Sequence, residues 1–351
     1  MLPVDDSSAA TPCTDSAGGG SRLDRPAAPT QPTAQPAARV RPEDVFSAAE
    51  WVALSARSRW VGLALVAHCW AVIGAAIAVG VLWPITLPLV IVVVGNRQLG
   101  LFVLMHEAAH GLMHPNRRIN DTVARWLCRF DLHGYRAEHL QHHRYVQQAL
   151  DPDLPLSAKF PVSPESLRRK LVRDLTGQTF YQQRFARLRA DLAARPAGVS
   201  GLSRTVTWIS AWRAELRRQP MFYAGNAAFA ALFAAFGLAW AWLLMWLLPL
   251  ATWLMLIARI RNIAEHALLP QGGSDPYQQA RTVTASRWER ILIAPYRVNF
   301  HSEHHLFTQI PCWRLPQAHA LLRDKGLLAR MEIQPSYQAV LNRAVAAQLT
   351  K

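Results

Sequence analysis

Long apolar blocks, broken by short polar segments, are the main pattern along the chain. Between Val61 and Trp83 the only ionisable side chains are His68 and Cys69. A second block runs to residue 105, and a third carries no charged side chain over the 38 residues from 221 to 258. Because a bilayer-spanning helix needs about 20 apolar residues, the third block is long enough for two spans. The pattern predicts four transmembrane helices in two hairpins, over about 61–83, 84–105, 221–239 and 241–260.

The distribution of charge gives the orientation of these spans. Between residues 115 and 220 the chain carries 19 Lys and Arg against 9 Asp and Glu, whereas the connections around Trp83 and Trp240 carry no charge. Basic loops stay on the cytoplasmic side of a membrane. We therefore predict an all-α integral membrane protein of the bacterial cytoplasmic membrane, with both termini on the cytoplasmic side. A helical cytoplasmic cap, formed by 106–220 and 261–335, covers the spans.

Composition indicates where the membrane domain ends and the two terminal tails begin. Residues 1–45 are rich in Pro, Ala, Ser and Thr and hold no continuous apolar stretch, which predicts a disordered tail without a signal peptide. The membrane domain covers 46–335, and 336–351 is assigned to a C-terminal tail. Within the cap, Ser-Pro-Glu at 163–165 is typical of a helix start. The basic amphipathic pattern that follows predicts a helix that lies on the bilayer surface or packs within the cap.

Histidines form the strongest chemical pattern in the sequence. The segment HEAAH at 106–110 places two histidines one helical turn apart, and both HLQHH at 139–143 and HSEHH at 301–305 have the spacing i, i+3, i+4. These spacings put the rings of each motif on one face of a helix. A further histidine follows the fourth apolar block in NIAEH. The topology places all of them on the cytoplasmic side. The candidate metal ligands are His106, His110, His139, His142, His143, His266, His301, His304 and His305.

Nine imidazoles are too many for one tetrahedral zinc ion. They suit a di-metal site, with several nitrogen ligands and an open position on each ion. Imidazole ligation is compatible with iron, at which dioxygen chemistry takes place. A carboxylate that accepts the second ring N–H of a ligand histidine fixes its tautomer. The candidates for this role, each next to a histidine in sequence, are Glu107, Glu138, Glu265 and Glu303.

The H-x3-H, H-x2-HH and H-x2-HH motifs with four spans resemble the membrane fatty acid desaturase superfamily over about residues 60–335. The strings YRAEHLQHHRYVQQALDPD and NFHSEHHLFTQIPCWRLP are also similar to its bacterial members. The resemblance implies a non-haem di-iron centre, with two iron ions as cofactor and O2 as co-substrate. It implies that His266 is a ninth ligand and that Asn262 holds a water on iron. The first spacing is shorter than the H-x4-H of acyl-CoA desaturases and looks more like that of acyl-lipid or other bacterial members.

Other functions are compatible with parts of the pattern. HEAAH alone fits a membrane zinc metallopeptidase, but the spans contain no Asp or Glu as a third ligand, and the other clustered histidines would have no role. A lipid or carotenoid hydroxylase or ketolase would use the same di-iron site. A metal-free scaffold protein would be expected to have lost at least one of the nine histidines.

The predicted reaction inserts a double bond into the acyl chain of a lipid. An unactivated C–H bond requires an oxidant formed at the metal, while the protein supplies position and excludes water. The sequence carries no haem-binding, dinucleotide or iron–sulfur motif, so we expect a separate electron donor, a ferredoxin-like or small haem protein. The basic cap would suit an acidic carrier, although membrane topology also explains its arginines. No nucleic-acid partner is expected.

Several polar residues are left outside this scheme. Arg97, the only charge within a span, is interpreted as a structural, hydrogen-bonded residue. His114 is not expected to be a ligand, His133 is left open, and His68 is interpreted as a hydrogen-bonded packing residue. His319 is expected to lie at the surface.

Overall fold

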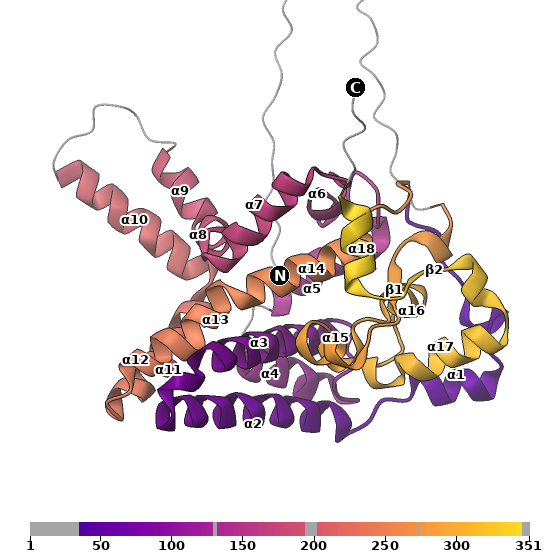
Figure 1. Cartoon of the computed structure of the whole chain (residues 1–351), viewed down its shortest axis with the longest axis horizontal. Coiled ribbons are helices and arrows are strands. Elements are labelled where there is room, and N and C mark those ends of the chain that lie inside the picture. Colours follow the sequence, from indigo (N-terminus) through magenta and orange to yellow (C-terminus); the bar gives the residue numbers. More distant parts are fainter. Residues whose placement is uncertain (1–34, 129–131, 194–201, 273, 346–351) are drawn as a thin grey trace, which may run out of the picture. The chain divides into compact units, whose positions relative to one another are not determined.

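The computed structural model describes residues 35–128, 132–193, 202–272 and 274–345, which are mostly helical (Figure 1). The helices and strands, in chain order, are η1 (Pro42–Asp44), α1 (Ala48–Ser55), α2 (Val61–Leu82), η2 (Pro84–Thr86), α3 (Leu87–Ala109), α4 (Arg117–Leu127), α5 (Leu132–Tyr145), α6 (Leu154–Ser157), α7 (Pro164–Leu175), α8 (Gln178–Arg184), α9 (Ala186–Ala193), α10 (Leu202–Arg218), α11 (Pro220–Ala235), α12 (Ala239–Trp242), the π-turn η3 (Leu243–Leu247), α13 (Leu248–Ala251), α14 (Trp253–His266), η4 (Pro276–Gln278), β1 (Arg281–Val283), α15 (Arg287–Leu292), η5 (Pro295–Arg297), α16 (His301–Leu306), η6 (Cys312–Arg314), α17 (Leu315–Asp324), η7 (Leu327–Arg330), β2 (Glu332–Gln334) and α18 (Tyr337–Ala344).

Three stretches of the described chain are long and apolar enough to cross a membrane. They are Val61–Leu82, Pro84–Ala109 and Ala239–His266, and they match three of the four predicted spans. The remaining predicted span corresponds to α11, which has 16 residues. This is shorter than the roughly 20 residues that a perpendicular span needs. An all-α membrane protein is therefore supported, while the fourth span and the two-hairpin arrangement stay predictions.

The turn between α11 and α12 lies where the sequence predicts it. Gly237 has φ 70°, and its N–H donates to the carbonyl of Ala234, while the N–H of Leu238 donates to that of Phe233. A left-handed glycine closed by such backbone bonds is a common helix end. The chain then re-enters a helix at Ala239.

The last apolar stretch is not a regular α-helix. The π-turn η3 precedes Pro249, whose ring cannot donate a backbone hydrogen bond. Nearby, the side-chain amide of Gln98 in α3 donates to the carbonyl of Trp246 at 2.8 Å. A side chain of the neighbouring helix thus supplies a hydrogen bond to a backbone carbonyl of the irregular turn. In an apolar environment such backbone groups need a partner within the protein.

Helix α3 is the centre of the packing, in contact with α2, α14 and α5 (Figure 1). The approach of α14 depends on Gly95, because a Cβ there would lie 2.8 Å from Cβ of Trp253. Most side chains from Leu99 to Ala109 are buried, and this half of α3 ends at the first histidine pair. The close contacts therefore fix where those two histidines lie.

The helical cap begins as predicted. Ser163 caps α7 by accepting a hydrogen bond from the N–H of Ser166, and Pro164 is the first helical residue. Helix α7 packs on α14, and Asp174 near its end forms an ion pair with Arg259. Of the two predicted positions for this helix, the structure thus favours packing within the cap. A parallel pair of strands, β1 and β2, adds a small sheet to the otherwise helical fold.

The folded region extends beyond both predicted tail boundaries. Residues 337–344, assigned to a C-terminal tail, form α18, in which Tyr337 and Val340 are buried against α14. At the other end, Ala37 is buried and its N–H donates to the carbonyl of Arg144. Apolar burial at these positions outweighs the polar composition around them. Residues 1–34 of the predicted N-terminal tail lie outside the described residues.

Candidate metal centre

Four helices bring the candidate ligands together. The first pair lies at the end of α3, where His110 is the capping residue, and α5 supplies the HLQHH motif. His266 is the last residue of α14, and α16 begins with the HSEHH motif. The structure brings the nine predicted histidines together and divides them into two groups.

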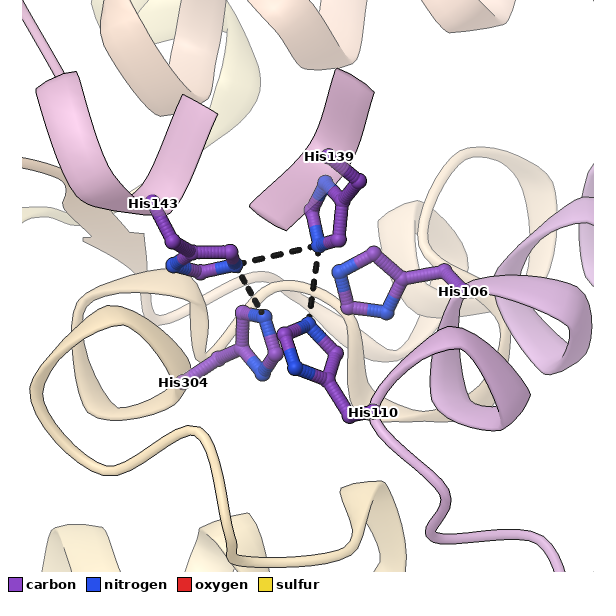
Figure 2. A group of neighbouring side chains, drawn as sticks. All are labelled: His106, His110, His139, His143 and His304. Carbon is purple, nitrogen blue, oxygen red and sulfur yellow. Dashed lines mark hydrogen bonds between the residues drawn. The ribbon is translucent and has the colours of Figure 1, made fainter. Parts of the chain in front are cut away.

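The first group contains five rings, His106, His110, His139, His143 and His304, whose nearest nitrogens all lie within 4.8 Å of one another (Figure 2). The Nε2 atom of His139 lies 2.9 Å from that of His110 and 3.0 Å from that of His143. Nε2 of His143 lies 3.1 Å from that of His304. The ring of His106 closes the group, with its centre 4.3 Å from that of His139.

The second group is formed by His142, His266 and His305, again within 4.8 Å of one another. His301 joins it, because its Nε2 atom lies 2.8 Å from that of His266 and 3.1 Å from that of His305. Nε2 of His142 lies 3.4 Å from that of His305. The two groups meet where His142 and His143 follow each other on α5.

These separations fit two metal ions. Two nitrogen ligands about 2.1 Å from one ion, at angles between about 90° and 110°, are about 3.0–3.4 Å apart. Several buried ring nitrogens also lack a hydrogen-bond partner, among them Nδ1 and Nε2 of His106, Nδ1 of His266 and Nδ1 of His304. The Nε2 lone pairs that converge within each group repel one another unless a cation or protons lie between them.

The electrostatics of the cluster favour metal over protons. Burial, followed by the nearby charge of Arg136, lowers the pKa of His110 to about 3. Burial, reinforced by the neighbouring rings, also holds the pKa of His139 and His143 well below the ordinary value of 6.5. The pKa values of His301, His304 and His305 are lowered in the same way. Neutral imidazoles are the form that binds a metal ion.

The predicted carboxylate partners have other contacts. Glu107 accepts a hydrogen bond from the N–H of Cys312, and its other oxygen stays 3.5 Å from Nδ1 of His106, which has no hydrogen-bond partner. Glu303 accepts hydrogen bonds from Thr282 and His319, both at 2.5 Å. His319, expected at the surface, is thereby half-buried.

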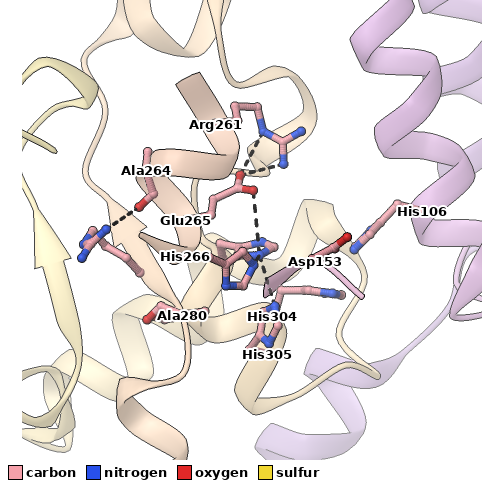
Figure 3. A network of polar contacts seen from close by, with 12 residues as sticks. His106, Asp153, Arg261, Ala264, Glu265, His266, Ala280, His304 and His305 are labelled. Carbon is pink, nitrogen blue, oxygen red and sulfur yellow. Dashed lines mark hydrogen bonds and ion pairs between the residues drawn. The ribbon is translucent and has the colours of Figure 1, made fainter. Parts of the chain in front are cut away.

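The two remaining glutamates also differ from the prediction. Glu265 accepts two hydrogen bonds from Arg261, shown in Figure 3, and its second oxygen is 3.9 Å from Nε2 of His301. Glu138 is exposed on α5. Within the described structure, none of the four glutamates hydrogen-bonds to a candidate ligand.

Sequence reasoning missed Asp151, whose carboxylate does hydrogen-bond to a candidate ligand. Its Oδ1 atom lies 2.8 Å from Nδ1 of His142, and both residues are buried. The backbone N–H groups of Gln147 and Asp153 donate to the same carboxylate at 3.0 and 2.8 Å. The Asp-Pro-Asp segment after HLQHH was the available signal, since a carboxylate shortly after a ligand helix can fold back onto it.

A cavity of about 580 Å³ leads to the histidines. Apolar side chains from α3, α11, α13 and α14 line much of it, including Leu99, Phe102, Phe222, Leu250 and Leu254. Five of the candidate ligands lie along it: His106, His139, His142, His266 and His301. Asn262 also faces this space, and its Oδ1 atom is buried without a hydrogen-bond partner. A buried carbonyl oxygen of this kind requires a donor such as water.

The residues left open in the sequence have structural contacts. Nδ1 of His114 accepts a hydrogen bond from the N–H of Asn116, before α4. Arg97 donates to the side chain of Asn96, and His68 lies 3.2 Å from the hydroxyl of Tyr296, but its side chain is exposed. His133 lies on α5 and is exposed.

Comparison with known proteins agrees with this geometry. The profile of the fatty acid desaturase family matches residues 81–336, and the chain belongs to that family. It is similar to the sn-1 oleoyl-lipid 12-desaturase of Picosynechococcus sp., with 25% identity over 75% of each chain. It is also similar to the dihydrorhizobitoxine desaturase of Bradyrhizobium elkanii, with 25% identity over 68% of each chain.

Proposed function

We propose that this protein is an O2-dependent desaturase that inserts a double bond into the acyl chain of a membrane lipid. The observation that carries the proposal is the convergence of nine histidines, seven of them buried, in two groups beside one largely apolar cavity. The five-ring group would hold one iron ion, and the group of His142, His266, His301 and His305 would hold the other. When bound, the irons supply the oxidant for the C–H bonds by reducing O2.

The chain's own residues position the substrate and exclude water. The apolar walls of the cavity would hold a hydrocarbon chain, and the histidines along one side would face the carbons to be oxidised. Asn262 would hold a water molecule beside the metal centre, which accounts for its unpartnered oxygen. In the overall reaction the substrate loses two hydrogens and O2 becomes two waters, with two electrons and two protons supplied from outside.

The electrons would come from a separate ferredoxin-like or small haem protein. Such a carrier would approach from the cytoplasmic side, where we place the metal centre and both termini. Exposed arginines of α7, such as Arg168 and Arg169, would attract an acidic carrier.

An acyl lipid is the substrate class that the cavity suits best. The two relatives act on different substrates, one on an oleoyl lipid and the other on dihydrorhizobitoxine. The largely apolar walls between α3, α11 and α14 favour a hydrocarbon chain over a small polar molecule. The length of the chain and the position of the new double bond depend on the depth of this cavity.

Lipid mass spectra test the proposal. The full chain is expressed in a bacterial host with a ferredoxin and its reductase, and compared with a His304→Ala variant. Loss of two hydrogens from one lipid class, absent in the variant, would support desaturation, whereas gain of one oxygen would indicate a hydroxylase on the same centre. The purified protein should contain about two irons per chain. One zinc ion per chain and unchanged lipids would contradict the proposal.

A further inference from the structure

A second cavity shares helix α3 with the first but is lined by different residues. It has a volume of about 670 Å³ and lies between α2, α3, α15 and η5. None of the nine candidate ligands lines it, and no Asp or Glu does so. Four arginines do, and we call this cavity the arginine groove after them: Arg97, Arg287, Arg290 and Arg297.

These arginines lack carboxylate partners. Among the described residues, no Asp or Glu lies within 4.0 Å of any of the four guanidinium groups. Glu289, the acidic residue of α15, is engaged elsewhere by the N–H groups of Ser286 and Tyr337. Four clustered positive charges without a counter-ion create a strong local preference for an anion.

Arg97 is the most unusual of the four, because it lies within a membrane-spanning stretch. Its guanidinium donates to Asn96 at 3.0 Å and lies 5.5 Å from the centre of the Tyr296 ring. Neither contact neutralises the charge. Ionised side chains inside membrane spans are costly and mark sites that bind a partner.

Asn96 provides an independent sign of a missing ligand. Its side chain lines the groove, is 3% exposed, and uses its oxygen for Arg97. Its amide nitrogen, Nδ2, is buried and has no hydrogen-bond acceptor. A buried donor of this kind loses free energy unless an acceptor reaches it.

The wall of the groove is held in a strained conformation. Tyr296 and Arg297 have φ values of 54° and 64°, in the left-handed region that side chains rarely adopt. The Tyr296 ring packs on Gly100, where a Cβ would lie 2.8 Å from Cε2 of the ring, and its hydroxyl donates to the carbonyl of Leu65. Such strain persists where surrounding contacts enforce it, commonly at binding sites.

Apart from His68, the rest of the groove is mostly apolar and borders a lipid-facing surface. Leu65 and Val72 of α2 and Val92 and Val93 of α3 line it. Beside it, α15 exposes Trp288, Ile291 and Leu292, with Trp288 at 71%. A short helix that combines basic residues with an exposed tryptophan is typical of the membrane interface.

We propose that the arginine groove binds an anionic phospholipid, whose phosphate lies among the four arginines and Asn96 and whose acyl chain follows the valines of α2 and α3. The phosphate oxygens would accept hydrogen bonds from Arg97 and from the free amide of Asn96. This lipid is a bound cofactor-like ligand and not the substrate, since no candidate metal ligand reaches the groove. An acidic protein would fit less well, because the apolar walls and a charge within a span require a hydrocarbon partner.

The test compares an anionic with a zwitterionic lipid, and a variant of the groove with a variant elsewhere on the surface. Purified, delipidated full-length protein is titrated with phosphatidylglycerol or phosphatidylcholine, and bound lipid is counted by native mass spectrometry alongside the melting temperature. The variant Arg287→Gln/Arg297→Gln removes two exposed charges of the groove. The matched control Arg168→Gln/Arg169→Gln removes two exposed charges from α7.

We expect phosphatidylglycerol to bind and to raise the melting temperature, with phosphatidylcholine much weaker. Each basic residue near an anionic lipid contributes a factor of about five, so the groove variant should bind more than about tenfold more weakly, and the control should match the unmodified protein. Arg97→Gln, which removes one charge, should weaken binding at least about fivefold, provided that its circular dichroism is unchanged.

Four results would overturn the proposal. The first is equal binding of the two lipids, and the second is equal loss of binding in the groove variant and the control. The third is an equal rise of the melting temperature with inorganic phosphate alone, which would indicate a simple anion site. If the groove variant lost carrier-dependent turnover but kept its phosphatidylglycerol, the groove would be a protein docking site instead.

Discussion

The Oδ1 atom of Asp151 lies 2.8 Å from Nδ1 of His142, and among the described residues it makes the one carboxylate–imidazole hydrogen bond of the nine candidate ligands. Two backbone N–H groups hold the carboxylate in place, from Gln147 and Asp153. With its Nδ1 side occupied, His142 presents Nε2 to the second histidine group.

Replacing Asp151 should weaken the second metal site. Loss of a carboxylate that orients a ligand histidine typically lowers metal affinity about 10- to 100-fold. For Asp151→Ala we expect metal content to fall from about two ions toward one per chain under dilute chelator, with activity falling in parallel. Element analysis after dialysis measures this. Asp153→Asn is the matched control, because its carboxylate is 3.8 Å from His142 and half exposed. Equal metal retention in both variants would contradict this role.

The contrast between Asp151 and the four predicted glutamates shows what a sequence can and cannot predict. Histidines at i, i+3 and i+4 share a face of one helix, so their convergence follows from local geometry. Adjacent residues on a helix do not face the same way, and for that reason Glu107 and Glu265 turn from their neighbouring histidines toward Cys312 and Arg261.

Asp151, by contrast, returns to His142 through a loop in which Gln147 has a left-handed φ of 60°. The Asp-Pro-Asp segment marks a carboxylate close to the ligand helix, but its spacing does not predict this left-handed reversal of the backbone. The fold of α18 also depends on tertiary contacts, since Tyr337 and Val340 are buried only because α14 lies against them. Helix α11 has the apolar composition of a span but ends after 16 residues, which composition alone did not predict.

Asn262 should affect turnover without affecting stability. Its buried Oδ1 atom has no protein partner, so Asn262→Ala removes no protein hydrogen bond made by that oxygen. If the side chain holds a water at the metal centre, loss of one hydrogen bond should lower turnover by up to about tenfold while both metal ions stay bound. Turnover and metal content of the same preparation give the answer. Unchanged turnover would assign Asn262 to the cavity wall alone.

Arg281 should be needed to hold the end of α14. It is fully buried, donates from Nη1 to the carbonyl of Ala264 at 2.9 Å, and contacts Glu332 at 3.3 Å. Arg281→Met leaves that carbonyl unpaired two residues before His266. We expect the free energy of unfolding to fall by about 2–4 kcal/mol, which combines a lost buried hydrogen bond with a broken ion pair.

Thermal unfolding in detergent measures the effect of Arg281→Met, and Arg343→Met is its control. Arg343 also pairs with Glu332 but is largely exposed, so its loss should cost less than about 1 kcal/mol. Similar losses in the two variants would show that the buried contact to Ala264 contributes little.

The metal-free protein should lose stability as the pH falls below about 6.5, the pKa of histidine in an unfolded chain. In the folded state, burial lowers the pKa of His110 to about 3 and holds those of His139, His143, His301, His304 and His305 well below 6.5. At a pH between the folded-state and unfolded-state pKa values, the histidines of the unfolded chain bind protons that those of the folded chain do not. Unfolding therefore becomes easier with acidification, by up to about 1.4 kcal/mol per pH unit for each such histidine.

Above about pH 6.5 both states are deprotonated at these positions, and the effect should vanish. Urea unfolding of the metal-free protein from about pH 5.5 to about pH 7.5 covers the range in which the histidines of the unfolded chain titrate. The variant His110→Asn removes one of these rings and should reduce the slope of unfolding free energy against pH by about the contribution of one histidine. Stability that stayed constant or rose on acidification would mean that the rings take up protons while folded, and so that the cluster does not favour a metal ion over protons.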